Sequence, residues 1–204
     1  MIKINALGDA CPLPVIKAKK ALRENAEIVI AVDNEIATQN LKKMGEQLGF
    51  QVESTQESEK VYHVLIRSAS PSNLPLPALQ RQDVERLSQR EESVSPYIVL
   101  IGSKSMGAGN DELGQTLLKI FIYSLTEQDV LPTHLLFYNE GAKLTTDSSP
   151  VLEDLETLKK ANVEILTCGA CLDYFDCIEK LAVGEVTNMF HIVELMSKYH
   201  VVRP

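Results

Sequence analysis

The residue with the clearest chemical potential is Cys11, which opens the sequence Cys-Pro-Leu-Pro ahead of a helical pattern that reaches about Arg23. Proline fits the first turn of a helix, where its missing N–H leaves no intrahelical bond unmade. With Pro12 and Pro14 at the first and third helical positions, the pattern makes Cys11 the N-cap. There the free N–H groups and the helix dipole favour the nucleophilic thiolate. The alternative is a small buried cysteine before a proline-started helix.

A second group of thiols lies in the sequence Cys168-Gly-Ala-Cys171, directly after a predicted strand at 163–166. In open parallel sheets, chemistry gathers at the carboxyl ends of strands. One thiol of a CxxC pair at a helix start is activated, and its partner can resolve a disulfide or persulfide. Cys177 lies six residues further on, where helical spacing turns it away from the pair, so we assign it to packing.

The sequence also raises two alternatives to thiol chemistry, a zinc site and a phosphate-binding loop. Zinc could take Cys168, Cys171, Cys177 and His191, but structural zinc usually pairs a CxxC with a second close pair, which this sequence lacks. The loop at 102–109 has the glycines of a phosphate cradle without the Gly-Lys-Ser/Thr of a P-loop. It is predicted as a β–α connection whose N–H groups could still bind an anion. We therefore expect no metal and no cofactor.

Composition limits the class of protein and its partners. The chain has 204 residues, of which 45% are hydrophobic and 5% aromatic, so its core is expected to be aliphatic. A net charge of -8 argues against a general nucleic-acid binder, which needs a basic surface. The sequence contains no apolar run long enough to span a membrane. Four cysteines are too few for a disulfide scaffold, and we expect a cytoplasmic protein.

The first part of the chain predicts a small α+β domain. Apolar periodicity places strands at 2–6, 27–32, 50–54 and 60–67, and helices at 12–24 and 36–48. The order βαβαββ predicts a two-layer sandwich, with two helices on one face of a four-stranded sheet. We assign this domain to residues 1–70. Residues 71–96, rich in Ser, Pro, Gln, Glu and Arg, are predicted to be a linker.

The rest of the chain, residues 97–204, predicts an α/β domain with a mainly parallel sheet covered by helices on both faces. Strands are expected at 97–101, 133–138, 163–166 and 201–202, and helices at 111–125, 149–160, 172–180 and 188–199. Leu113, Leu117 and Ile120 fall on one face of the first of these helices, with Leu118 beside them. Ser149 is the predicted N-cap of the second helix.

The sequence Leu-Gly-Asp-Ala-Cys-Pro-Leu-Pro at 7–14, opening a βαβαββ unit, resembles the TusA (SirA-like) sulfur-carrier family over roughly residues 1–70. The hallmark of that family is Cys-Pro-x-Pro, and its cysteine carries a persulfide sulfur. The resemblance therefore implies this role for Cys11. One departure is Asn40, which stands where many members have an aspartate.

The second half resembles the DsrE/DsrF-like family, whose members form oligomers and carry sulfur on a cysteine after a central strand. Cys168 stands at the matching place, and Cys171 adds a second thiol. Both halves together resemble the two-domain YedF-type proteins linked to selenium metabolism. The resemblance implies a chalcogen carrier, and a homo-oligomer formed through the C-terminal domain.

Our hypothesis is a sulfurtransferase-like carrier that relays persulfide sulfur, or selenium, from Cys11 to Cys168. A cysteine desulfurase or another persulfide donor would load Cys11, and Lys17 in the first helix would favour negative charge nearby. Cys171 would then release the cargo to a downstream acceptor by forming a disulfide. The alternatives are a dithiol–disulfide oxidoreductase at Cys168 and Cys171, in which Cys11 has no role, and a non-catalytic interaction protein.

Overall fold

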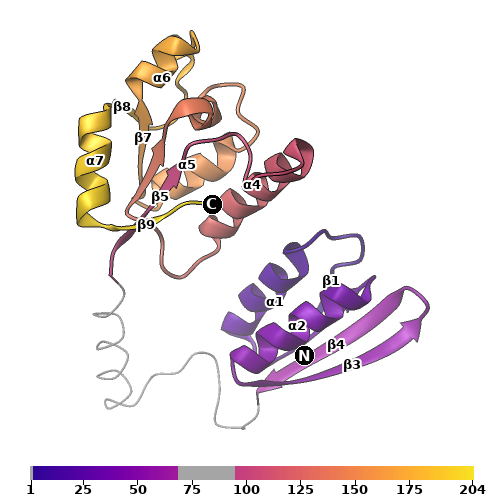
Figure 1. Cartoon of the computed structure of the whole chain (residues 1–204). Helices are drawn as coiled ribbons and strands as arrows, with labels where there is room; N and C mark the ends of the chain where they lie inside the picture. Colours follow the sequence, from indigo (N-terminus) through magenta and orange to yellow (C-terminus); the bar gives the residue numbers. More distant parts are fainter. Residues whose placement is uncertain (1, 69–94) are drawn as a thin grey trace, which may run out of the picture. The chain divides into compact units, whose positions relative to one another are not determined.

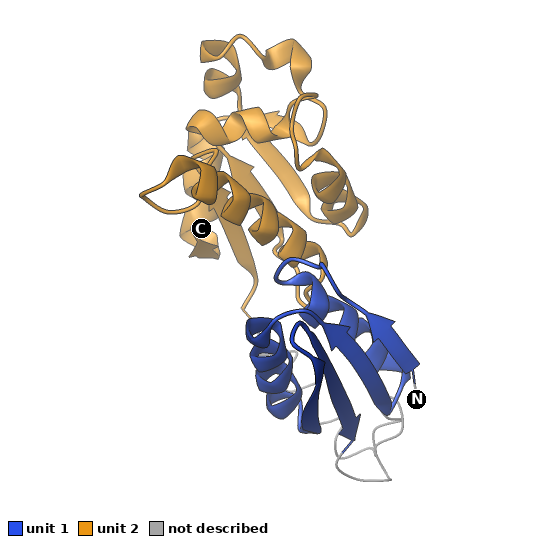
Figure 2. Ribbon diagram, turned by 90° about the vertical axis from the view of Figure 1, so that its right-hand side faces the viewer, with its two compact units in different colours: residues 1–89 blue, residues 90–204 orange. Residues whose placement is uncertain are grey.

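The computed structural model describes residues 2–68 and 95–204 of the chain. The chain divides into two compact units, residues 1–89 and 90–204, which are coloured separately in Figure 2. The predicted linker at 71–96 lies outside the described residues, apart from its last two positions. The domain limits therefore stay a prediction, and each unit is described on its own.

The first unit is a four-stranded mixed sheet with two helices on one face (Figure 1). The strand order is β1-β2-β4-β3, in which β1 pairs parallel with β2 and the other neighbours are antiparallel. The two-layer α+β sandwich predicted from the sequence is thus confirmed. Its elements are β1 Ile2–Asn5, α1 Leu13–Glu24, β2 Glu27–Val32, α2 Glu35–Gln47, β3 Phe50–Ser58 and β4 Val61–Ser68.

The core of the first unit lies between the sheet and the two helices. In β2, Ile28, Ile30 and Val32 are fully buried, while the residues between them are only partly buried. This alternation follows from the two-residue period of a strand, because only one face of the sheet is covered by helices. Leu22 of α1 and Leu41 of α2 pack into the same cluster.

The second unit is a five-stranded parallel sheet in the order β8-β7-β6-β5-β9. Helix α7 covers one face, and α4 and α5 cover the other (Figure 1). The predicted α/β class with a parallel sheet is confirmed. The elements are β5 Tyr97–Ile101, α4 Asp111–Thr126, β6 His134–Phe137, 3-10 helix η1 Asn139–Thr145, α5 Leu152–Lys160, β7 Glu164–Cys168, α6 Gly169–Tyr174, 3-10 helix η2 Ile178–Lys180, β8 Glu185–Thr187, α7 Met189–Lys198 and β9 His200–Val202.

Each face of this parallel sheet has its own aliphatic core. Leu118 of α4 and Leu155 of α5 pack with Phe137 on one side of the sheet. On the other side, Ile192 of α7 packs with Leu166 and Cys168 of β7. Alternate residues of one strand therefore contribute to different cores, which explains why these strands are apolar at nearly every position. Every helix among residues 2–68 and 95–204 is too short or too polar to cross a lipid bilayer.

The packed face of α4 differs from the sequence prediction. The buried residues of α4 are Gly114, Leu118, Ile122 and Leu125, whereas Leu113 is 57% exposed and Leu117 is 40% exposed. Helix α4 is apolar around most of its circumference, so periodicity alone did not identify the face that packs.

The start of α5 and the region after β7 also differ from the prediction. Helix α5 begins at Leu152 with Val151 as N-cap, and the Ser149 hydroxyl instead accepts the Val151 N–H at 3.3 Å. Pro150 lies between the predicted cap and the observed one. The single helix expected at 172–180 is replaced by α6 and η2, and β8 and η1 were not predicted.

Gly141 in η1 lies so close to the end of β5 that a Cβ there would overlap the carbonyl group of Ile101. We expect Gly141→Ala to destabilise the second unit by about 1–3 kcal/mol, because backbone cannot move aside as a flexible side chain can. Hydrogen exchange of peptides covering β5 and β6 should accelerate. Glu140→Ala in the same 3-10 helix serves as the control and should leave exchange unchanged. Equal exchange in both variants would contradict this packing argument.

Candidate thiol sites

Cys11 lies in a turn immediately before α1, with its side chain exposed. The turn is closed by the Leu13 N–H, which donates to the Ala10 carbonyl at 2.9 Å. The carbonyl of Pro12 accepts the first helical bonds, including that from the Val15 N–H at 3.0 Å. Pro12 is therefore the N-cap, and the predicted N-cap position of Cys11 is wrong by one residue. The thiol still lies at the amino end of α1.

The loop that carries Cys11 is held to the carboxyl end of β2 by two hydrogen bonds. The Ala6 N–H donates to the Ala31 carbonyl at 2.9 Å, and the Gly8 N–H donates to the Asp33 carboxylate at 2.8 Å. Gly8 has a φ of +81°, a conformation that favours glycine. The Gly8 N–H, followed by the Asn34 side chain, lowers the pKa of Asp33. The Asp33 carboxylate therefore stays ionised, and keeps its hydrogen bond, to lower pH than an ordinary aspartate would.

A polar side chain from α2 lies beside the Cys11 sulfur. The Asn40 side-chain Nδ2 lies 4.0 Å from Cys11 Sγ. The ammonium group of Lys17 instead forms an ion pair with Asp9. This contact does not favour the prediction that Lys17 stabilises negative charge at the sulfur. The adjoining hollow has a volume of only about 40 Å³, too small for a drug-sized ligand. An exposed sulfur beside so small a hollow suits reaction with a group carried by another protein.

We expect Asn40→Asp to slow alkylation of Cys11 by iodoacetamide at neutral pH by about threefold to tenfold. A carboxylate beside the sulfur would disfavour the thiolate, whereas the amide N–H can donate to it. The rate is measured by mass spectrometry of the peptide that contains Cys11. Gln39→Glu adds the same charge at the next position of α2 and should leave the rate unchanged. Equal slowing by both variants would show that Asn40 has no local effect.

The second thiol site lies at the carboxyl end of β7, as the sequence predicted. Cys168 is the last residue of β7 and the N-cap of α6, and its side chain is only 2% exposed. Cys171 is half-buried, and its sulfur accepts the backbone N–H of Asn139 at 3.0 Å. Asn139 follows β6 closely and has a φ of +49°, which asparagine tolerates better than most residues. Neighbouring strand ends therefore bring the donor and the sulfur together.

The environment of Cys171 acts on its proton in opposing ways. Burial raises the pKa of the Cys171 thiol, the Asn139 N–H lowers it in part, and neighbouring Cys168 raises it again. The net effect is upward, so the protonated form is favoured at neutral pH. Asn139 was missed by the sequence analysis. Asn139 could have been found because it follows β6, the strand that pairs with β7, so both strand ends lie at the same edge of the sheet.

Alkylation of Cys171 should be slow near neutral pH and should accelerate only above the ordinary range of a thiol, because its raised pKa keeps the thiolate scarce. Cys168→Ala removes one upward contribution and should shift this profile toward lower pH. Both profiles can be measured by quantifying alkylated peptides across a pH series, with Cys11 in the same chain as the reference. A neutral-pH rate for Cys171 equal to that of free cysteine would contradict this account.

The remaining candidates from the sequence have structural roles. Cys177 is 7% exposed and packs with Ala142 and Leu172, as expected for a packing residue. His191 Nδ1 lies 3.0 Å from the Thr187 hydroxyl. In the part of the chain that the structure describes, no three His, Cys, Asp or Glu side chains are grouped to hold a metal ion. The arrangement therefore gives the zinc alternative no support.

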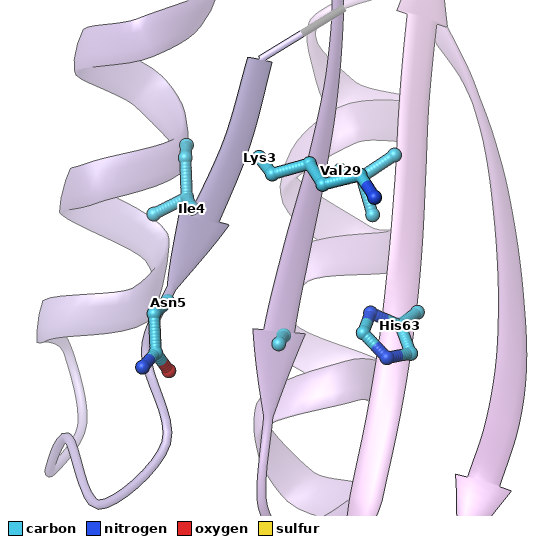
Figure 3. Close-up of a pocket in the computed structure, with 6 residues that line it drawn as sticks. Lys3, Ile4, Asn5, Val29 and His63 are labelled. Carbon is cyan, nitrogen blue, oxygen red and sulfur yellow. The ribbon is translucent and has the colours of Figure 1, made fainter.

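The first unit also has a larger hollow, on its sheet, that contains no thiol. Its volume is about 450 Å³, and Figure 3 shows Lys3 of β1, Val29 of β2 and His63 of β4 around it. The His63 ring contacts the Glu57 carboxylate at 2.7 Å. None of the lining residues is a cysteine, so this hollow is separate from the thiol chemistry.

Fold and site together define the first unit as a small α+β domain that presents an exposed thiol at the start of its first helix. The sequence model of the family described as Sulfurtransferase TusA matches residues 2–68. A Methanocaldococcus jannaschii protein described as a sulfur carrier protein is 36% identical over 70 residues, which cover 33% of this chain and 93% of the relative. The chain belongs to the TusA family through this unit.

Several solved structures are also similar to parts of the chain. A SirA-like protein from Desulfitobacterium hafniense is 46% identical, covering 34% of this chain and 100% of its own, with a TM-score of 0.32. A Methanobacterium thermoautotrophicum protein is 18% identical, with a TM-score of 0.43. The match covers 54% of this chain and 99% of that protein. The ychN protein of E. coli is 15% identical, also with a TM-score of 0.43. The match covers 53% of this chain and 99% of that protein.

Proposed function

We propose that this chain is a sulfur carrier that accepts persulfide sulfur at Cys11 and passes it to the thiol pair of the second unit. The observation that carries the proposal is the exposed Cys11 sulfur, beside Asn40, in the unit that matches the TusA family. Family membership and the sulfur-carrier relative support the carrier role. The relay between particular cysteines rests on the chemistry of the two sites.

Loading is a thiol–persulfide exchange. The Cys11 thiolate attacks the outer sulfur of a donor persulfide, such as that of a cysteine desulfurase. A new S–S bond forms at Cys11, and the donor leaves as a thiolate that takes up a proton. The step needs no external oxidant, because the donor's thiolate is the leaving group. The exposed position of Cys11 allows the close approach of the donor that this attack requires.

Cys171 is more exposed than Cys168, which favours Cys171 as the first thiol of the second unit to accept sulfur. The sequence placed the incoming sulfur on Cys168, but Cys168 is 2% exposed and Cys171 is the more accessible thiol. The Cys171 thiolate attacks the outer sulfur of the Cys11 persulfide, and Cys11 leaves as a thiolate. The raised pKa of Cys171 makes its thiolate scarce but more nucleophilic. Because both thiols belong to one chain, transfer is an intramolecular step at high effective concentration.

Cys168 can then release the cargo when no other acceptor is present. Its thiolate attacks the inner sulfur of the Cys171 persulfide, a Cys168–Cys171 disulfide forms, and hydrosulfide leaves. The Cys168 sulfur is oxidised from thiolate to disulfide, the outer sulfur is reduced to hydrosulfide, and the Cys171 sulfur keeps its oxidation state, so electrons balance within the step. A downstream acceptor thiol would compete by attacking the outer sulfur instead. Selenium in place of sulfur would follow the same sequence of bonds.

The proposal predicts that Cys11→Ser abolishes loading of the second unit. The full chain is incubated with a cysteine desulfurase and cysteine, and sulfur on each cysteine peptide is measured by mass spectrometry under non-reducing conditions. In the unmodified chain, sulfur or a disulfide should appear at Cys168 and Cys171. Cys177→Ala is the matched control and should retain both, since Cys177 only packs. Repeating the experiment with selenocysteine identifies the cargo.

The same experiment separates the carrier from the dithiol–disulfide oxidoreductase. The closeness of the Cys168 and Cys171 thiols is the observation that favours the oxidoreductase as a second candidate function. An oxidoreductase would keep its thiol–disulfide exchange after Cys11→Ser, whereas the relay would lose transfer. Absence of added sulfur on Cys11 in the unmodified chain would overturn the proposed carrier function.

A further inference from the structure

A hollow in the second unit is lined by three lysines, which are its only charged lining residues among residues 95–204. It lies among the loop before α4, α4 itself, the end of η1 and the segment before α5, and its volume is about 210 Å³. The polar residues that line it are Lys104, Gln115, Lys119, Lys143, Ser148 and Ser149. In the described part of the second unit, no aspartate or glutamate belongs to the lining. In a chain with a net charge of -8, this concentration of positive charge needs an explanation.

Two of the three ammonium groups have no partner among residues 2–68 and 95–204. Lys104 and Lys119 make no hydrogen bond or ion pair there, whereas Lys143 Nζ lies 3.9 Å from the centroid of the Phe175 ring and 4.0 Å from the Glu140 carboxylate. Like charges that line one hollow repel one another, and a bound anion would relieve that repulsion. The hollow is therefore electrostatically suited to an anionic ligand.

The neutral groups of the hollow can add hydrogen bonds to an anion. The Ser149 hydroxyl oxygen accepts the Val151 N–H, so its own O–H remains able to donate. The Ser148 hydroxyl lies 3.3 Å from that of Thr146, and the Gln115 amide supplies two further N–H donors. A ligand with several oxygen acceptors matches this set better than a monatomic anion does.

We propose that this hollow binds the phosphate group of a small ligand, either inorganic phosphate or a phosphate monoester. The ammonium groups supply charge, and the hydroxyl and amide groups supply directional bonds to the phosphate oxygens. Leu118 and Leu144 complete the lining and offer apolar contact to the organic part of a monoester. The proposal concerns only the second unit and does not depend on the proposed sulfur transfer.

The test is a titration of the full chain with inorganic phosphate and, separately, with phenyl phosphate, followed by NMR of backbone amides. Sodium chloride at matched ionic strength corrects for general screening. We expect saturable shifts at the residues around Gln115 and Ser149. The double variant Lys104→Gln/Lys119→Gln should weaken phosphate binding about tenfold or more, since it removes two charged contacts. Tighter binding of phenyl phosphate would identify a monoester, and equal or weaker binding would identify inorganic phosphate.

Lys159→Gln/Lys160→Gln is the matched control, because these lysines lie at the end of α5 and are not part of the lining. It removes the same total charge and should leave binding unchanged. Ser149→Ala provides a second variant that changes no charge and should weaken binding by a smaller factor. Absence of saturable shifts in the unmodified chain, or equal loss in both double variants, would overturn the phosphate site.

Discussion

The hydrogen bond from the Gly8 N–H to the Asp33 carboxylate ties the Cys11 loop to the end of strand β2. The Ala6 N–H bond to the Ala31 carbonyl and the ion pair of Asp9 with Lys17 anchor the loop further, while Cys11 itself is exposed. The lowered pKa of Asp33 keeps the acceptor ionised well into acidic solution. As pH falls through that lowered value, the carboxylate is protonated and the stability that the bond contributes is lost. The Cys11 sulfur is thereby exposed while the loop that carries it stays anchored.

The second unit positions its thiols by a different physical route. Cys168 is fixed by packing at the end of a buried strand, and the Cys171 sulfur is fixed by the Asn139 N–H from the neighbouring strand end. The close approach of Gly141 to Ile101 holds η1 in the place that this donor requires. One unit therefore offers an accessible sulfur, and the other holds a sheltered pair. Such a difference suits a carrier that first meets a donor and then protects its cargo.

Much of the fold follows from local patterns in the sequence. The strand at 97–101 was predicted with its observed limits, because a short apolar run after a polar segment has few other interpretations. Details that depend on tertiary contacts were missed. The cap at Pro12 depends on a turn closed by the Ala10 carbonyl, and the packed face of α4 depends on which of two apolar stripes meets the sheet. The donor role of Asn139 arises from strand order, which a single sequence does not specify.

In the proposed sulfur carrier, Cys11 receives sulfur before any other cysteine of this chain does. A time course with a cysteine desulfurase and limiting cysteine, rapidly quenched with an alkylating agent, resolves that order by mass spectrometry of each cysteine peptide. We expect sulfur to appear first on the Cys11 peptide and then to move to the peptide with Cys168 and Cys171 as the Cys11 signal declines. Sulfur that reaches Cys168 or Cys171 first, or at an undiminished rate in Cys11→Ser, would contradict it.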